Sequence, residues 1–230
     1  KEGKPGATRP LGIANFEDKL VQKMTAKVLG SIYEPAFLDC SYGFRPGRGC
    51  HDALRALSHH LYSWPVETVI DVDLENFFGS IRADVLDTLL RERITDKRFL
   101  RYVQRLLKSG VLRAGELTIS EEGVPQGSPA SPILANVVAH YVIDLWFETV
   151  VKVHCQGQVA MFRYADDLVI CCQMASDAER VHKALGRRLE RFGLRLNEEK
   201  SRLVSFSRAS LRRGIRQGSF DFLGLTFLPG

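Results

Sequence analysis

The chain lacks the cysteine patterns of disulfide frameworks and zinc sites. Its five cysteines are odd in number, and none stands in a CxxC or Cys/His ligand spacing, which predicts reduced thiols in the cytoplasm and argues against structural zinc. No apolar run approaches the roughly 20 residues that cross a bilayer, and the first six residues do not form a signal peptide. We therefore expect no membrane partner and a chain that begins within a longer protein.

The chain does have an ample supply of apolar residues and an excess of positive charge. Of its 230 residues 45% are hydrophobic, which suits one large domain or two subdomains. The formal net charge of +5 points to a polyanion, which is a nucleic acid, a membrane surface or an acidic protein. Basic clusters around acidic strands favour nucleic-acid chemistry with a metal ion, although each cluster alone also fits a solvated surface. The clusters are Lys1–Arg9, Arg45–Arg48, Arg91–Lys108 and Arg202–Arg216.

The spacing of apolar residues predicts an α+β domain. Helical periodicity predicts helices over 16–31, 51–61, 82–92 and 99–108, and a buried helix over 133–150. Apolar runs and turn signals predict strands over 66–74, 159–163, 168–172, 202–206 and 220–227, and a hairpin over 111–119. Ser176 and Glu179 form a capping-box pattern for one more helix, which ends at Gly193.

Three aspartates beside apolar strands are the main candidates for chemistry. Asp73 stands near the end of one strand, and Asp166-Asp167 lie at the tip of a predicted hairpin. Asp71 and Asp73 share a face because side chains alternate along a strand. Carboxylates held close together need a cation, and Mg²⁺ with oxygen ligands is the natural candidate. Either motif alone also fits a turn or a solvated strand face, but together they favour metal-assisted phosphoryl transfer.

A series of motifs in collinear order resembles bacterial group II intron reverse transcriptases, which are also called maturases. The resemblance runs through nearly all 230 residues and implies an RNA-directed DNA polymerase of the bacterial cytoplasm that supports intron retrohoming and RNA splicing. It implies a right-hand polymerase fold with fingers and a palm, the palm being a ferredoxin-like antiparallel sheet backed by helices, and a thumb that is absent. The motifs are Arg9–Ile13, Phe16–Gln22, Ser41–Arg48, His51–Leu54, Asp71–Phe78, Gly123–Asn136, Tyr164–Asp167, Gly193–Ser201 and Phe222–Gly224.

The resemblance implies a catalytic metal centre at the three aspartates. Asp73, Asp166 and Asp167 match the catalytic residues and metal ligands, and the carbonyl of Leu74 matches an extra ligand. The implied cofactor is a pair of Mg²⁺ ions, for which Mn²⁺ is a substitute. Asp71 lies outside this ligand set.

The resemblance also assigns residues to the incoming dNTP. Phe78 matches the steric gate that excludes a ribose 2′-hydroxyl. Arg9 matches an arginine that grips the triphosphate, and its lysine partner is Lys4 or the nearby Lys1. Gln126 matches a residue that lines the nucleotide pocket. Lys200 matches a lysine near the departing pyrophosphate, although a solvated lysine fits equally well.

A last group of residues is expected at the primer and template. Arg45 and Arg48 are basic candidates for backbone contacts, as is the segment 208–216. Phe222-Leu223-Gly224 resembles the hairpin that positions the primer terminus. The expected partners are group II intron RNA, an RNA template with a DNA primer, dNTPs and a second copy of the chain in a homodimer.

The predicted boundaries and alternatives complete the interpretation. We expect fingers over 1–65 and 91–124, and a palm over 66–90 and 125–230. One alternative is an intron-RNA-binding splicing factor that makes little use of its polymerase site; another is a domesticated reverse transcriptase associated with a retron, a CRISPR array or phage defence. The intact acids favour the polymerase, and Gln126-Gly127 argues against diversity-generating enzymes.

Overall fold

A computed structural model describes residues 15–108, 111–113, 116–118 and 128–229. The chain divides into two compact units, each built from two segments. One, here called the helical unit, comprises Lys1–Phe37 and Asn76–Ala139. The other, here called the sheet unit, comprises Leu38–Glu75 and His140–Gly230.

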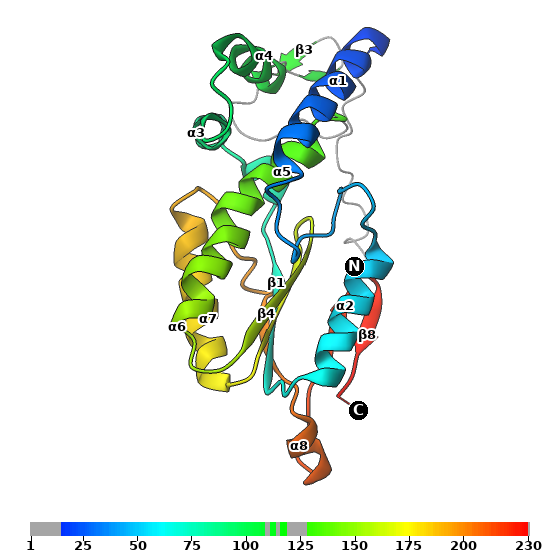
Figure 1. Cartoon of the computed structure of the whole chain (residues 1–230), viewed down its shortest axis with the longest axis vertical. Coiled ribbons are helices and arrows are strands. Elements are labelled where there is room, and N and C mark those ends of the chain that lie inside the picture. Colours follow the sequence, from blue (N-terminus) through cyan, green and yellow to red (C-terminus); the bar gives the residue numbers. More distant parts are fainter. Residues whose placement is uncertain (1–14, 109–110, 114–115, 119–127, 230) are drawn as a thin grey trace. The chain divides into compact units, whose positions relative to one another are not determined.

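An antiparallel sheet of four strands forms the centre of the sheet unit (Figure 1). The strands lie in the order β4-β5-β1-β6, and every neighbouring pair is antiparallel. This agrees with the predicted antiparallel sheet of an α+β fold. The strand bounds are β1 Thr68–Asp73, β4 Val159–Tyr164, β5 Asp167–Cys172 and β6 Arg202–Ser205.

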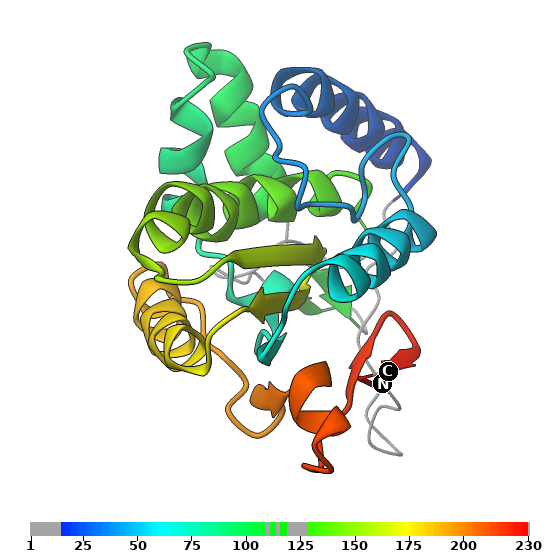
Figure 2. The same cartoon turned by 60° about the horizontal axis from the view of Figure 1, so that its bottom comes forward.

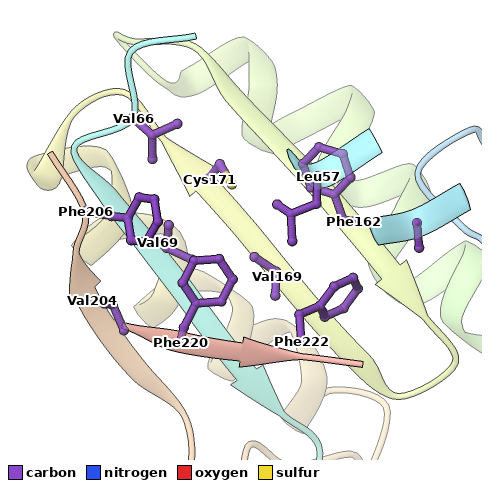
Figure 3. Packing of buried hydrophobic residues seen from close by; sticks show 11 residues of the cluster. Leu57, Val66, Val69, Phe162, Val169, Cys171, Val204, Phe206, Phe220 and Phe222 are labelled. Carbon is purple, nitrogen blue, oxygen red and sulfur yellow. The ribbon is translucent and has the colours of Figure 1, made fainter. Parts of the chain in front are cut away.

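One face of the sheet packs against α2 (Cys50–Ser63) and against a hairpin of β7 (Phe220–Phe222) and β8 (Leu225–Phe227). Ala53 of α2 belongs to the buried cluster between these elements. Leu57 projects from α2, and the buried rings of Phe220 and Phe222 project from the hairpin toward the strands (Figure 3). These side chains cover the apolar residues on this face of the sheet. Val69 is one of them and is fully buried. Burial of this apolar surface is the main force that holds α2 to the sheet.

The opposite face of the sheet packs against α7 (Ala175–Glu190), which also contacts a π-helical segment, η2 (His140–Asp144). The π-helical segment belongs to a continuous helical stretch, Ser131–His154, that runs through α5 (Ser131–Ala139), η2, η3 (Phe147–Val151) and α6 (Lys152–His154). This stretch has the length and composition of a membrane span, but 61% of its most apolar window is buried within the protein. It is therefore the buried core helix predicted over 133–150.

The helical unit is built from α1 (Phe16–Tyr33), α3 (Ala83–Arg91), α4 (Lys97–Lys108) and α5. Helix α5 contacts both α1 and α3, and α3 contacts α4. The hydroxyl of Tyr33, buried at the end of α1, donates hydrogen bonds to the carbonyls of Leu89 and Leu90 in α3. The hairpin predicted over 111–119 is present as β2 (Val111–Arg113) and β3 (Glu116–Thr118), and its turn lies outside the described residues.

The fingers and palm boundaries stay a prediction, because the compact units group segments by packing alone. Residues 38–65 lie in the sheet unit, where α2 packs on the strands, and 76–90 lie in the helical unit, where α3 packs against α4. The capping box predicted at Ser176 is wrong, because α7 begins at Ala175 and makes no side-chain cap. Instead, the Glu67 carboxylate accepts a hydrogen bond from the Ala175 amide at 3.1 Å.

Candidate active site

Two of the predicted metal ligands face each other across neighbouring strands. Asp73, the last residue of β1, is paired in register with Asp167, the first residue of β5. Tyr164, the last residue of β4, is paired with Asp167 on the other side. Directly opposed residues of antiparallel strands point to one face with their Cβ atoms about 5 Å apart. Tyr164, Asp167 and Asp73 therefore form one half-buried row across the sheet, here called the acidic row.

The backbone of Asp73 is held by residues that precede β6. The Asp73 amide donates to Ser201 Oγ at 3.1 Å, and the Ser201 hydroxyl donates back to the Asp73 carbonyl at 3.2 Å. The amide of Asn197 donates to the same carbonyl at 2.9 Å. Three hydrogen bonds thus fix the end of β1 at the point where Asp73 projects.

Asp71 lies one pair along the same face and has a different partner. Its Oδ2 accepts from Nε of Arg202 on β6 at 3.2 Å. The Arg202 side chain is 53% exposed and that of Asp71 is 14% exposed. The protein therefore supplies a cation for Asp71, and its place outside the ligand set stays a prediction.

Asp166 occupies the two-residue turn between β4 and β5 and is exposed. Among the residues that the structure describes, no group of three or more His, Cys, Asp or Glu side chains is gathered to hold a metal ion. The pair Asp73 and Asp167 nevertheless suits a hard divalent cation, because like charges directly opposite each other repel unless a cation neutralises them. The acidic row thus fits the predicted metal, and Asp166 stays a predicted third ligand.

A buried ion pair supports the turn that carries Asp166. The Arg163 side chain is fully buried, and its Nε and Nη2 donate to the two carboxylate oxygens of Asp144 at 2.7 and 2.6 Å. Nη2 also donates to Ser41 Oγ at 2.7 Å, and Nη1 donates to the carbonyl of Ala165, the first turn residue, at 3.1 Å. Burial disfavours the charged guanidinium, but the Asp144 carboxylate outweighs it and raises the pKa of Arg163. One guanidinium therefore joins the turn, the long helix and the loop at Ser41.

The loop 41–44 approaches the same turn closely. The amide of Tyr42 donates to the Arg163 carbonyl at 2.8 Å, and the Arg163 amide donates to the Cys40 carbonyl at 2.8 Å. A Cβ atom added at Gly43 would lie 2.5 Å from the backbone nitrogen of Ala165, so only glycine fits there. Ala165 itself has a φ of 57°, a strained conformation for a residue with a side chain. The close contact at Gly43 and the hydrogen bonds to Arg163 therefore hold the β4–β5 turn in a single conformation.

A family comparison identifies the fold that presents these acids. A model of the family described as reverse transcriptase (RNA-dependent DNA polymerase) matches residues 1–227. The chain belongs to this reverse transcriptase family.

Relatives and solved structures agree with this assignment. The chain is 39% identical over 134 residues to the group II intron-encoded protein LtrA of Lactococcus lactis, a match that covers 57% of this chain and 22% of LtrA. It is 31% identical to protein YkfC of Escherichia coli, over 86% of this chain and 60% of YkfC. A telomerase structure from Candida albicans shares the fold, with a TM-score of 0.64, 16% identity, and coverage of 93% of this chain and 36% of that one. The chain thus spans less than two thirds of each of these relatives.

Two phenylalanines follow the first aspartate motif of this reverse transcriptase chain. Phe77 is 3% exposed, whereas Phe78 is half-buried. Their rings pack edge to face with the centroids 5.7 Å apart. Phe77 is therefore a core residue. The gate role of Phe78 stays a prediction.

The two arginines of the loop before α2 have different surroundings. Arg45 is 8% exposed, and its Nη1 donates to the carbonyls of Leu38 and Ser41 at 2.7 and 2.8 Å, so it holds the loop together. Arg48 is half-buried, forms an ion pair with Asp39 and lies over the Tyr42 ring. Burial makes Arg45 poorly suited to the primer or template contact expected for it, because that contact needs an accessible guanidinium.

The remaining predicted site residues have mixed surroundings. Phe222 is 2% exposed within the core of the sheet unit, and Leu223 and Gly224 form the β7–β8 turn with φ of 50° and 81°. Lys200 is exposed, and Leu74 is buried and forms a bridge with Leu196. Their functional roles stay predictions. The candidates Lys1, Lys4, Arg9 and Gln126 lie outside the described residues.

Sequence reasoning missed the support of the turn. Arg163 stands in an apolar strand, and Asp144 stands in the apolar stretch 133–150. Charges of opposite sign in two largely apolar elements are a signal for a buried ion pair, since such charges are costly without a partner. These observations indicate a partner for Arg163 in the stretch 133–150, and the structure shows that it is Asp144 and not Glu148.

Proposed function

We propose that the chain is the RNA-templated DNA polymerase domain of a group II intron-encoded protein. The reaction is nucleotidyl transfer from a dNTP to the 3′-hydroxyl of a primer on an RNA template. In the intact protein this activity supports intron retrohoming, and binding of intron RNA supports splicing. The observation that carries the proposal is the acidic row, in which Asp73 and Asp167 are directly opposed at the end of a sheet of the reverse transcriptase family.

Asp73 and Asp167 would hold the divalent cation, with Asp166 as the third ligand. When bound, Mg²⁺ or its substitute Mn²⁺ lowers the pKa of the attacking hydroxyl and neutralises charge on the leaving pyrophosphate. The hydrogen bonds of Ser201 and Asn197 fix the Asp73 backbone, so its carboxylate projects from a set position. Arg163 fixes the turn from which Asp166 projects. Catalysis of phosphoryl transfer depends mainly on such positioning and charge stabilisation.

Primer extension on an RNA template with dNTPs and Mg²⁺ tests the proposal. The assay uses the protein at its natural length and compares Asp167→Asn with Asp71→Asn, which removes the same charge one pair along the same face. Because several kcal/mol of metal-based stabilisation are lost, Asp167→Asn is expected to slow extension by about 100-fold or more. Asp71→Asn is expected to retain extension. Equal rates in the two variants would overturn the assignment.

Asp167→Asn and the unmodified protein together distinguish the polymerase from a splicing factor. Asp167→Asn is expected to bind intron RNA and to support splicing as the unmodified protein does, because the carboxylate acts through the metal and not through RNA contacts. Intact splicing together with absent extension in the unmodified protein would favour the splicing-factor alternative.

A further inference from the structure

A hollow of about 590 Å³ lies in the sheet unit where α2 leads into β1. Its walls come from the connection 63–67, from Gln173 after β5, and from 207–213, which includes α8 (Arg208–Arg212). Helix α8 stands at the end of the sheet away from the β4–β5 turn, and Figures 1 and 2 show it projecting there in orange. We call this hollow the α8 pocket.

The α8 pocket is positively charged. Arg208, Arg212 and Arg213 line it, and the segment 206–219 contains four arginines and no acidic residue. Arg212 and Arg213 are exposed. Within the part of the chain that the structure describes, none of the three lining guanidiniums forms an ion pair, and Glu67 is the one acidic residue of the wall. Such a surface attracts an anion, and arginine suits phosphate in particular.

Aromatic rings lie next to these cations. Trp64 lines the pocket, is 42% exposed, and has its ring stacked on His60 with the centroids 5.9 Å apart. Tyr62 is 79% exposed, and the Arg208 guanidinium lies 5.7 Å from its ring centroid. Arg208 also donates to the Tyr62 carbonyl at 2.6 Å, so the arginine ties α8 to the connection. Exposed aromatic rings beside arginines are the surface on which bases stack while phosphates are neutralised.

The α8 pocket is separate from the acidic row. β1 follows directly after Glu67 in the pocket wall and ends at Asp73. The five steps from Thr68 to Asp73 span about 17 Å at about 3.4 Å per residue. Cys172 and Ser205, the last residues of β5 and β6, are both paired with Thr68 at the pocket end. A ligand in the pocket therefore lies at the opposite end of the sheet from the polymerase site.

We propose that the α8 pocket binds single-stranded nucleic acid, with a base stacked on Trp64 and phosphates contacted by Arg212 and Arg213. The pocket is a second anchor for a strand outside the polymerase site. This binding requires neither a metal ion nor nucleotide addition. An RNA strand and a DNA strand share the base and the phosphodiester that the pocket recognises, so both are included in the test.

The test measures Trp64 fluorescence in the Trp146→Phe variant, because Trp64 and Trp146 are the two tryptophans of the chain. The probes are a uridine 12-mer and a thymidine 12-mer, added in EDTA without dNTPs. Either probe is expected to quench Trp64, because stacking places a base on its ring. In the background with both tryptophans, Trp64→Ala is expected to weaken binding about tenfold and Trp64→Phe to retain it, since base stacking needs an aromatic ring.

Matched charge variants test the phosphate contacts. Arg212→Ser/Arg213→Ser is expected to weaken binding and to reduce the slope of log affinity against log salt by about 1.4, at about 0.7 per phosphate for single strands. Lys183→Ser/Arg187→Ser removes the same charge from exposed positions of α7 and is the control. Equal loss in the control would overturn the proposal in favour of general charge attraction.

Two further outcomes would overturn the proposal, and a third separates it from the polymerase. An oligoglutamate that displaces the probes with an affinity unchanged by Trp64→Ala would overturn it in favour of an acidic protein partner. Binding without any change in Trp64 fluorescence would also overturn it. Asp167→Asn is expected to bind the probes normally, so failure of polymerisation and failure of this proposal are read independently.

Discussion

Two arginine–aspartate pairs involve strands of the sheet that carries the acidic row, and they differ in their environment. Arg163 and Asp144 are both 0% exposed, whereas Arg202 is 53% and Asp71 14% exposed. The buried pair also bonds to Ala165 and Ser41, which fixes the turn; the other pair joins two strands that are already paired. A buried charge is tolerated when it is fully partnered and it then specifies geometry, while an exposed pair contributes little.

The largest expected effect comes from breaking the buried pair. Arg163→Met leaves the Asp144 carboxylate buried without its cation, so the free energy of unfolding is expected to fall by about 3–5 kcal/mol. Urea denaturation followed by circular dichroism measures the change. A loss below about 1 kcal/mol would show that water reaches Asp144 and that the pair does not clamp the turn.

A double variant distinguishes stability from positioning. Arg163→Met/Asp144→Leu replaces both charges with apolar groups, which is often neutral for stability, so unfolding is expected to recover most of the loss. Primer extension is expected to stay low, because the hydrogen bonds to Ala165 and Ser41 are still missing. Recovery of both properties would limit the pair to a stabilising role.

Gly43→Ala is expected to produce the next largest effect. The added Cβ would meet the Ala165 nitrogen at 2.5 Å, and the resulting backbone shift is expected to cost about 1–3 kcal/mol. The Mg²⁺ concentration needed for half-maximal primer extension should rise, since the turn carries Asp166. The control is Gly30→Ala in α1, where nothing lies within 4 Å and where alanine is expected to raise stability by up to about 1 kcal/mol.

The thiol beside the buried pair provides a prediction about pH. Burial, followed by the charge of Asp144, raises the pKa of the Cys40 thiol from 9.0 to about 12. Between those values the unfolded chain loses a proton that the folded chain keeps, so stability falls as pH rises. From pH 8 to pH 10 the unmodified protein should lose about 1 kcal/mol more than Cys40→Ala does. Identical pH profiles in thermal unfolding would contradict this.

The smallest expected effect comes from the exposed pair. Arg202→Met is expected to change the free energy of unfolding by less than about 1 kcal/mol, because solvent screens an exposed ion pair. Urea denaturation in low and high salt measures it. A loss as large as that of Arg163→Met would remove the distinction between the two pairs.

The amino-acid sequence predicted the local elements well because most of them carry a simple period. The helix expected over 16–31 is α1, and the strand expected over 66–74 contains β1. The start of α7 was wrong because the Glu67 carboxylate, distant in sequence, takes the place of the expected capping side chain. The compact units depend on how α2 and α3 pack, which the local sequence pattern does not reveal.

The candidate site divides in the same way. Residue types and order singled out the aspartates of the two local motifs, and the resemblance to reverse transcriptases separated Asp71 from Asp73, Asp166 and Asp167. The structure adds that Asp73 and Asp167 are directly opposed and that Arg202 forms an ion pair with Asp71. For Arg45 the sequence was misleading. Its arginine-rich loop suggested a nucleic-acid contact, but Arg45 is buried within that loop and bonds to the Leu38 carbonyl, which gives it a structural role.

The sequence by itself determined the chemistry of this protein: which acids are available, which strands and helices form, and which polymerase family the motifs belong to. Tertiary structure alone decided how these parts meet. Strand register set Asp73 opposite Asp167, and a fully buried Arg163 connected the turn, the long helix and the loop at Ser41. The reason is physical: alternation and periodicity act over a few residues, whereas register and charge burial depend on segments that are separated along the chain.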